Sequence, residues 1–393
     1  MTTTVIITLC CLLLLAYLFD LTSSKTRIPS VILLLLLGWL VKELTSAAKF
    51  ELPDLSSILP ILGTVGLILI VLEGSLELEL NKSKSTLIRQ SLLMAFIPMM
   101  AMTFLLAWMF QYYGGNGFKT NLSNAIPFCI ISSSIAIPSA GNLSRKYRDF
   151  VIYESSMSDI VGVVFFNFVL FNASFGLSSF LHFGFEIFVI VLVSFIATIL
   201  LSFLLSRISH HIKFAPIVLL VILIYEISKL YHLPSLLFIM IFGLSIGNLE
   251  KIKNFSWIQK FRPDELKTEV KKFKELVVEA AFIIRSLFFL LFGYLLKTEE
   301  ILNSQTLIWA LVITVLIFIF RAFQLLLIKL PLSPLLFVAP RGLITILLFL
   351  SIGAEQEILL VNKSLIIQVI MLTALIMMFG LMATKKDKPP IQG

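Results

Sequence analysis

Long apolar runs separated by short polar segments dominate this chain of 393 residues. About 20 apolar residues in an α-helix are enough to cross the roughly 30 Å hydrocarbon core of a bilayer. The runs are continuous rather than alternating, which excludes a transmembrane β-barrel. We predict thirteen transmembrane helices, at 4–19, 28–44, 57–78, 86–110, 123–143, 149–173, 181–206, 214–230, 234–249, 276–296, 304–328, 332–354 and 364–383.

Composition agrees with an all-α polytopic membrane protein. Hydrophobic residues make up 59% of the chain and charged residues 14%, whereas about a quarter of a soluble domain is charged. The N-terminal run has neither a basic n-region nor a cleavage site, so we predict a retained span rather than a signal peptide. Cys10, Cys11 and Cys129 lie in apolar segments, which predicts neither disulfides nor a metal cluster.

The net charge of +8 reflects basic loops and not a nucleic-acid surface. With the N-terminus outside, the inside loops and tail carry 22 Lys and Arg residues and the outside loops carry 6. Basic loops face the cytoplasm, so this bias predicts a multi-pass protein of the plasma or inner membrane with its C-terminus inside. The only long connection, 250–275, carries eight of these basic residues and is predicted to be a surface amphipathic segment.

An internal repeat is visible in the second and ninth spans. "RIPSVILLLLLGWL" at 27–40 resembles "HLPSLLFIMIFGLS" at 232–245, with Pro-Ser at the start and Gly38 matching Gly243. The two spans are seven apart in chain order, and an odd separation means opposite orientation in the membrane. The third and tenth spans are similar in the same register, which indicates an inverted-topology repeat of six spans each, with the seventh span as the linker.

The fifth and twelfth spans correspond in this repeat, and each contains a mid-span proline. We expect Pro138 to free a carbonyl near Ser134, with Ser133 and its neighbours adding hydroxyl oxygens, and Pro340 to break the twelfth span. Interrupted helices in corresponding positions are the best sequence indication of a transporter's binding site.

Ionisable residues in mid-membrane are candidates for function. They are Glu73, Glu154, Asp159, Arg285, Arg321 and Arg341. Residues four apart share a helix face, so Ser155 lies with Asp159, while Glu154 lies with Ser158 on a neighbouring stripe. The first stripe offers oxygen ligands to a small cation, and the second can face an arginine.

The sequence resembles the monovalent cation:proton antiporters of the Na⁺/H⁺ exchanger superfamily. "YESSMSD" is similar to that family's motif of Glu-Ser, two residues and Asn-Asp, and "APRGLITILLFLSI" to its Arg-Gly segment. "LGTVGLILIVLEGSLELEL" looks like its third span, with Glu73 as the acid, and "FIFRAF" like the span with its buried arginine, here Arg321.

This resemblance implies roles for single residues. Asp159 would alternately bind a cation and a proton, with Ser155 and Glu73 completing a Na⁺ site. Glu154 would pair with Arg341, and Arg321, always charged, cannot carry the proton. Arg285 has no counterpart in the family pattern, and its pairing with Glu73 is a separate hypothesis.

The resemblance also implies a homodimer in which a core transport domain moves against a dimerisation domain, with no cofactor and no enzymatic activity. We expect dimerisation helices at 1–80 and 214–296, core helices at 86–173 and 304–383, a linker helix at 181–206 and a cytoplasmic tail at 384–393.

Two departures from the family pattern affect the site. The family's Thr-Asp-Pro at the break of the fifth span is replaced by "SSSIAIPS", which has no acid, and Ser158 stands where Asn precedes the key Asp. Electroneutral exchange of Na⁺, or of Li⁺ or K⁺, for H⁺ is the leading hypothesis. A K⁺/H⁺ antiporter, a carrier of another small solute, and a non-transporting sensor or scaffold stay open.

Overall fold

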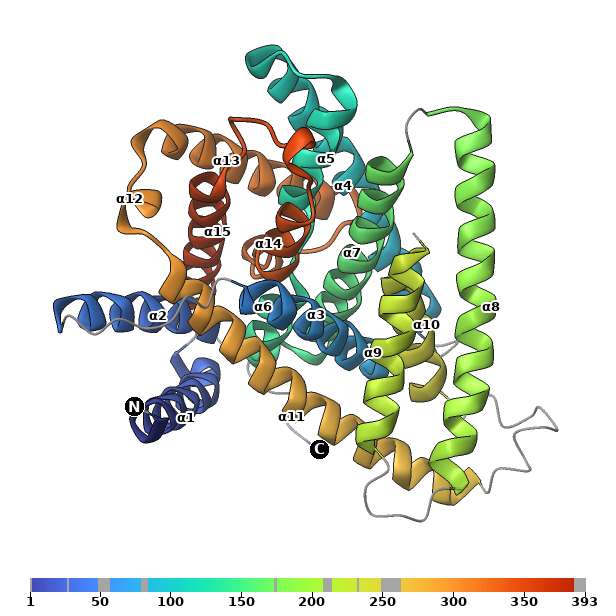
Figure 1. Ribbon diagram of the computed structural model, residues 1–393. Helices are drawn as coiled ribbons and strands as arrows, with labels where there is room; N and C mark the ends of the chain where they lie inside the picture. Colours follow the sequence, from blue (N-terminus) through green and yellow to red (C-terminus); the bar gives the residue numbers. More distant parts are fainter. Residues whose placement is uncertain are drawn as a thin grey trace. The chain divides into compact units, whose positions relative to one another are not determined.

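The computed structural model describes residues 2–26, 28–48, 57–78, 84–172, 175–207, 214–231, 233–248 and 263–384. Residues 250–262 of the predicted basic segment and 385–393 of the predicted tail lie outside these residues. All regular elements in the described ranges are helical (Figure 1). The helices are α1 (Thr2–Thr26), α2 (Ser30–Ala47), α3 (Ile58–Glu77), α4 (Ser85–Gly114), α5 (Phe118–Cys129), α6 (Ser133–Ser139), α7 (Arg145–Phe171), α8 (Leu177–Arg207), α9 (Phe214–Leu230), α10 (Ser235–Gly247), α11 (Pro263–Leu295), α12 (Thr298–Ile301), α13 (Ser304–Leu327), α14 (Leu343–Leu350) and α15 (Lys363–Ala383), with short 3₁₀ turns at Ala140–Asn142, Leu335–Phe337 and Ala354–Gln356.

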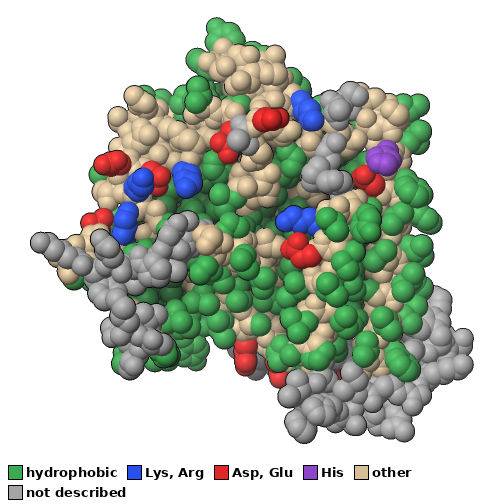
Figure 2. All heavy atoms as spheres, in the orientation of Figure 1, with side chains coloured by type: hydrophobic (Ala, Val, Ile, Leu, Met, Phe, Trp, Pro, Cys, Tyr) green, Lys and Arg blue, Asp and Glu red, His purple; other side chains and the backbone are tan. Residues whose placement is uncertain are grey.

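The predicted spans coincide with these helices. Nine helices in the described part of the chain are long and apolar enough to cross a membrane, if α5 and α6 are counted as one interrupted span. The other predicted spans correspond to α7, to the shorter helices α9 and α10, and to the interrupted stretch that contains α14. Figure 2 shows many hydrophobic side chains on the face in view, as a surface in contact with lipid requires.

Local sequence explains where several helices begin. Pro29 and Pro234 immediately precede α2 and α10, where a fixed φ near −65° is compatible with helix entry and the missing N–H costs nothing. Asn303 and Asn362 cap α13 and α15, and each side chain accepts a hydrogen bond from a backbone amide in the first turn.

The chain divides into two compact units, and four long helices run from one unit into the other. The first unit comprises Met1–Thr64, Gln90–Asp159 and Ile283–Gly393, and the second comprises Val65–Arg89 and Ile160–Phe282. The first unit contains both interrupted spans and Asp159. The predicted division into core and dimerisation domains is a separate matter and stays a prediction.

A close helix crossing occurs in each unit at a glycine that the repeat matches. In the first unit Gly38 of α2 lies against the backbone of α11, where an added Cβ would come within 2.8 Å of Tyr294 N. In the second unit Gly243 of α10 lies against α3, where an added Cβ would come within 2.6 Å of Ser75 Cβ. In the repeat α2 corresponds to α10 and α11 to α3, so the two crossings are equivalent contacts.

Candidate ion-binding site

The break in the fifth span lies between α5 and α6. Ile130 and Ser132 have extended backbones, with ψ angles of 128° and 115°. The predicted break at 132–138 is therefore correct at Ser132 and wrong after it, because α6 begins at Ser133 and contains Pro138. Three consecutive amides freed by the break each donate to a different partner: Ile131 N to Ser158 Oγ at 2.9 Å, Ser132 N to Pro340 O at 2.9 Å, and Ser133 N to Asp159 Oδ2 at 3.3 Å.

Asp159 lies on α7 with its carboxylate at the start of α6. Its side chain is buried, and Oδ2 accepts hydrogen bonds from both the amide and the hydroxyl of Ser133. Within the described residues Oδ1 has no hydrogen-bond partner. A buried carboxylate oxygen without a partner is costly, and a bound cation or proton removes that cost. The structure thus brings Asp159 and Ser133 together.

Two other predicted ligands make local hydrogen bonds. Ser155 is buried one turn before Asp159, and its hydroxyl donates to Val151 O at 2.7 Å, so its lone pairs are not used by that bond. The Ser134 hydroxyl lies 2.9 Å from the Ser132 hydroxyl. No hydrogen bond joins Ser155 or Ser134 to Asp159 in the described part of the chain.

Glu154 forms a buried, bidentate ion pair with Arg321 of α13. Arg321 Nη1 donates to Glu154 Oε1, and Nη2 donates to Oε2 at 2.7 Å. Arg321 Nε also donates to Leu335 O at 3.2 Å. The expected pairing of Glu154 with Arg341 is therefore wrong. Both arginines lie in mid-span, but the face of α7 that carries Glu154 meets α13.

Arg341 instead binds backbone carbonyl groups at the two helix breaks. Its Nε donates to Phe128 O at 2.6 Å and its Nη1 to Ala339 O at 2.9 Å, while its amide donates to Thr373 Oγ1 at 3.1 Å. Phe128 lies in the last turn of α5, where free carbonyls carry partial negative charge. A cation thus lies at the end of α5, and the Asp159 carboxylate lies at the start of α6.

The break in the twelfth span packs directly on that in the fifth. An added Cβ on Gly342 would lie 2.7 Å from Ser132 Oγ and from Ile135 Cδ1. Only a residue without a side chain allows this approach, and it brings the Pro340 carbonyl within reach of the Ser132 amide. The two breaks therefore satisfy each other's backbone groups, as irregular backbone at membrane depth requires.

The other two predicted mid-membrane residues are Glu73 and Arg285. Glu73 is half-buried on α3 in the second unit, so its role as a ligand of the Na⁺ site stays a prediction. Arg285 on α11 is buried, and the described residues offer it no hydrogen-bonding or ion-pair partner. They also contain no group of three or more His, Cys, Asp or Glu side chains that could hold a metal ion.

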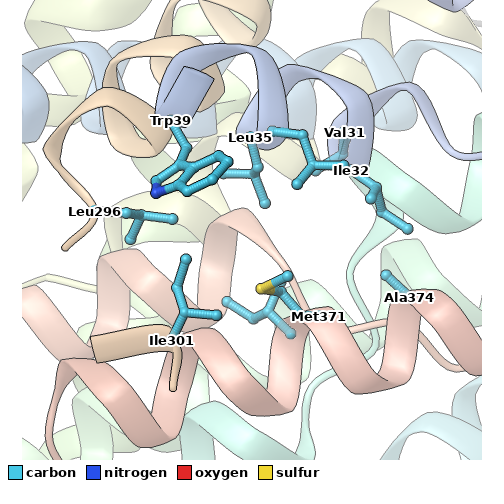
Figure 3. Close-up of a pocket in the computed structure, with 10 residues that line it drawn as sticks. Val31, Ile32, Leu35, Trp39, Leu296, Ile301, Met371 and Ala374 are labelled. Carbon is cyan, nitrogen blue, oxygen red and sulfur yellow. The ribbon is translucent and has the colours of Figure 1, made fainter. Parts of the chain in front are cut away.

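Two cavities in the first unit differ in chemistry. One, of about 30 Å³, has Ser158, Arg321, Gln324 and Arg341 among its lining residues and is large enough for a water molecule. The other, of about 20 Å³, lies between α2 and α15 and is lined by apolar side chains and Trp39 (Figure 3). The apolar cavity offers no oxygen ligands, so it is not a candidate ion site.

Gln324 and Thr373 belong to this network but were not predicted. Gln324 is a polar residue in the apolar run "RAFQLLL", one turn after Arg321, so helical spacing could have indicated it. Thr373 also lies in an apolar helix, but its partner is a backbone amide, which no side-chain pattern can indicate.

Comparison with known proteins gives a family and a fold. The family model described as "Sodium/hydrogen exchanger, transmembrane" matches residues 10–384. A structure of the sodium proton antiporter MjNhaP1 from Methanocaldococcus jannaschii at pH 8 is similar, with a TM-score of 0.63 and 18% identity over 97% of this chain and 96% of that one. An electron-microscopy structure of the same antiporter gives 0.69 and 19%, over 99% and 100%. No curated protein sequence matches the chain significantly.

Proposed function

The chain belongs to the sodium/hydrogen exchanger family, and from this premise we propose that it exchanges Na⁺ for H⁺ with Asp159 as the carrier group. The family establishes a multi-pass membrane transporter of small cations and protons rather than an enzyme. Sodium as the cation, the stoichiometry and the residue roles are parts of the proposal.

One observation carries the assignment of Asp159. Its Oδ2 is held by Ser133, while its buried Oδ1 has no partner in the described residues. A free carboxylate oxygen can take a proton or serve as a hard oxygen ligand for a small cation. One oxygen cannot do both at once, and this exclusion is the basis of antiport.

The surrounding residues have separate tasks in this mechanism. Ser155 supplies a hydroxyl oxygen from the same face of α7 as Asp159, and Glu73 is the second predicted ligand of the cation. The Glu154–Arg321 ion pair has no net charge, and in this proposal it has no part in the exchange of the proton. In this proposal the proton and the cation both bind at Asp159, so the charge of this carboxylate changes in the cycle.

The direct test is Asp159→Asn reconstituted into proteoliposomes. Asparagine keeps the shape but neither binds a proton nor carries charge, so Na⁺-dependent dissipation of a pH gradient is expected to vanish. Asp149→Asn, the same substitution ten residues earlier on α7, is the matched control and should retain exchange. Full activity in the Asp159 variant would overturn the assignment.

Potassium is the alternative cation, favoured by the absence of an acid at the break of the fifth span. Fewer charged ligands give a weaker field at the site, which favours the larger and more easily dehydrated ion. A panel of Na⁺, Li⁺ and K⁺ at several pH values distinguishes the two. Absence of exchange with every cation would instead support a sensor or scaffold.

We also propose the assembly and orientation that the sequence predicts. The protein is a homodimer with its N-terminus outside and its C-terminus in the cytoplasm. The core helices at 86–173 and 304–383 move against the dimerisation helices to expose Asp159 to each side in turn. Mass measurement in detergent tests the dimer, and the accessibility of tags at the termini to proteases tests the orientation.

A further inference from the structure

Pro98 lies inside α4, one of the long membrane helices. Proline has no amide hydrogen, so the carbonyl four residues earlier, at Met94, loses its helical hydrogen bond. This carbonyl is deep in the first unit, and the Met94 side chain is buried. A carbonyl left unpaired in such a place is unfavourable and requires a donor from another element.

Gln324 of α13 supplies that donor. Its Nε2 donates to Met94 O at 2.5 Å and to Glu154 Oε1 at 3.3 Å. A carboxamide nitrogen carries two hydrogens, so one group can make both bonds. The Gln324 side chain is 5% exposed, and it lies beside the small polar cavity that Pro98 and Arg321 also line.

The position of Gln324 connects the kink in α4 with the buried ion pair. Gln324 and Arg321 are three residues apart and share a face of α13. Together they supply three hydrogen bonds to the Glu154 carboxylate, and through Gln324 they also hold the free carbonyl of α4. Glu154 is five residues before Asp159 on α7, so whatever fixes Glu154 also fixes the helix that carries the ion site.

We propose that Gln324 is a positioning residue for transport: it satisfies the Met94 carbonyl that Pro98 leaves free and thereby holds α4, α7 and α13 in the register that places Asp159 against Ser133. This inference rests on the proposed function for its effect on transport, but its structural part does not. Gln324 contacts neither the cation nor the proton in this arrangement.

The proposal makes Gln324 and Pro98 energetically coupled. Gln324→Leu removes both hydrogen bonds and leaves Met94 O unpaired. Pro98→Ala restores an amide at position 98, which can donate to Met94 O within the helix. The loss of stability caused by Gln324→Leu is therefore expected to be smaller in the Pro98→Ala background. Stability recovers only in part, because Glu154 still lacks its third hydrogen-bond donor.

The experiment compares the full-length wild type, the two single variants and the double variant. Thermal unfolding of the purified proteins is measured first, since it does not depend on transport. We expect Gln324→Leu to lower the melting temperature by about 3 °C or more, and the double variant to recover part of this shift. Gln305→Leu, at the exposed start of α13, is the matched control and should have no effect.

Transport gives the second measurement. Gln324→Leu should raise the cation concentration for half-maximal exchange about tenfold, the equivalent of one buried hydrogen bond lost with its partner left unpaired, and Pro98→Ala should reverse part of this. If Gln324→Leu does not fold, Gln324→Asn, which has a shorter side chain, replaces it in the same comparison.

The outcomes separate the two proposals. If Gln324→Leu lowers the melting temperature equally in the wild-type and Pro98→Ala backgrounds, the proposed coupling is wrong. Coupled stability with an unchanged half-maximal concentration would make Gln324 structural only and would overturn its positioning role. Coupled stability without exchange of any tested cation would contradict the proposed function, while leaving the hydrogen-bond network intact.

Discussion

At the scale of single residues, the buried arginines Arg321 and Arg341 have partners of different kinds. Arg321 is matched by the Glu154 carboxylate, whereas Arg341 is held by carbonyl groups of Phe128 and Ala339. A guanidinium can make such bonds from five N–H groups in a fixed plane, which an ammonium cannot. The full charge of Arg341 therefore acts at the end of α5, near the break that has no acid of its own.

The Glu154–Arg321 pair makes a prediction about stability. Arg321→Met leaves a carboxylate buried without its main partner, which should lower the free energy of unfolding by about 3–5 kcal/mol. Neutralising both groups, with Glu154→Gln in addition, should cost less than Arg321→Met alone. Denaturant or thermal unfolding in detergent measures both variants. A double variant less stable than the single one would contradict the pairing.

At the element scale, the breaks and the glycine crossings decide how closely the helices approach. A backbone hydrogen bond from the Ser132 amide to the Pro340 carbonyl joins the breaks of the fifth and twelfth spans. The crossings at Gly38 and Gly243 join equivalent helices of the two repeats. Side chains larger than hydrogen would separate the backbones at these points, so small residues are required by packing and not by flexibility.

A prediction for the crossings follows from the space around each glycine. Gly38→Ala and Gly243→Ala place a methyl group within 2.8 Å of a neighbouring helix, and each should lower the free energy of unfolding by about 1–3 kcal/mol. Gly184→Ala on α8 is the control, because no atom lies within 4 Å of its added Cβ. The control should be neutral or slightly stabilising, since alanine favours helix. Equal effects at all three positions would refute the crossing argument.

The sequence predicts the membrane helices and the presence of two interrupted spans, but it does not predict which helices meet. Hydrophobic runs located the helices because membrane thickness fixes their length. The matched prolines of the fifth and twelfth spans predicted that both spans are interrupted, and the structure brings Ser133 of the fifth span to Asp159. The partner of Glu154 was misassigned, because periodicity within a helix says which residues share a face but not which other helix that face meets.

The position of the first break was missed for a related reason. The predicted break extends over 132–138, yet α6 begins at Ser133 and continues through Pro138. The interruption lies where three free amides donate hydrogen bonds to Ser158, Pro340 and Asp159. Those acceptors come from distant parts of the chain, so a local pattern cannot locate the break.

At the scale of the whole molecule, the charge carried in each half-cycle is the quantity that matters. In the proposed mechanism Asp159 enters one half-cycle with a proton and the other with a monovalent cation, and both states have the same net charge. The Glu154–Arg321 pair keeps its charges throughout. Exchange should therefore be one for one and electroneutral.

Current measurement on a solid-supported membrane tests this stoichiometry. A Na⁺ gradient applied to the reconstituted protein should produce a pH change in the lumen but no sustained transport current. An imposed membrane potential should likewise leave the exchange rate unchanged. A current that scales with the gradient would require a second titrating group and would refute the one-for-one scheme.

The anchoring of a single oxygen has a consequence for speed. Ser133 holds Oδ2 of Asp159 and leaves Oδ1 without a partner in the described residues. If both cargoes bind at Oδ1, replacing one by the other is a substitution at one atom, and the bonds to Ser133 need not break. The barrier to exchanging the proton for the cation is then low. Turnover would be limited by the helix movement that carries the site between the two membrane faces. The temperature dependence of the exchange rate should therefore be that of this movement.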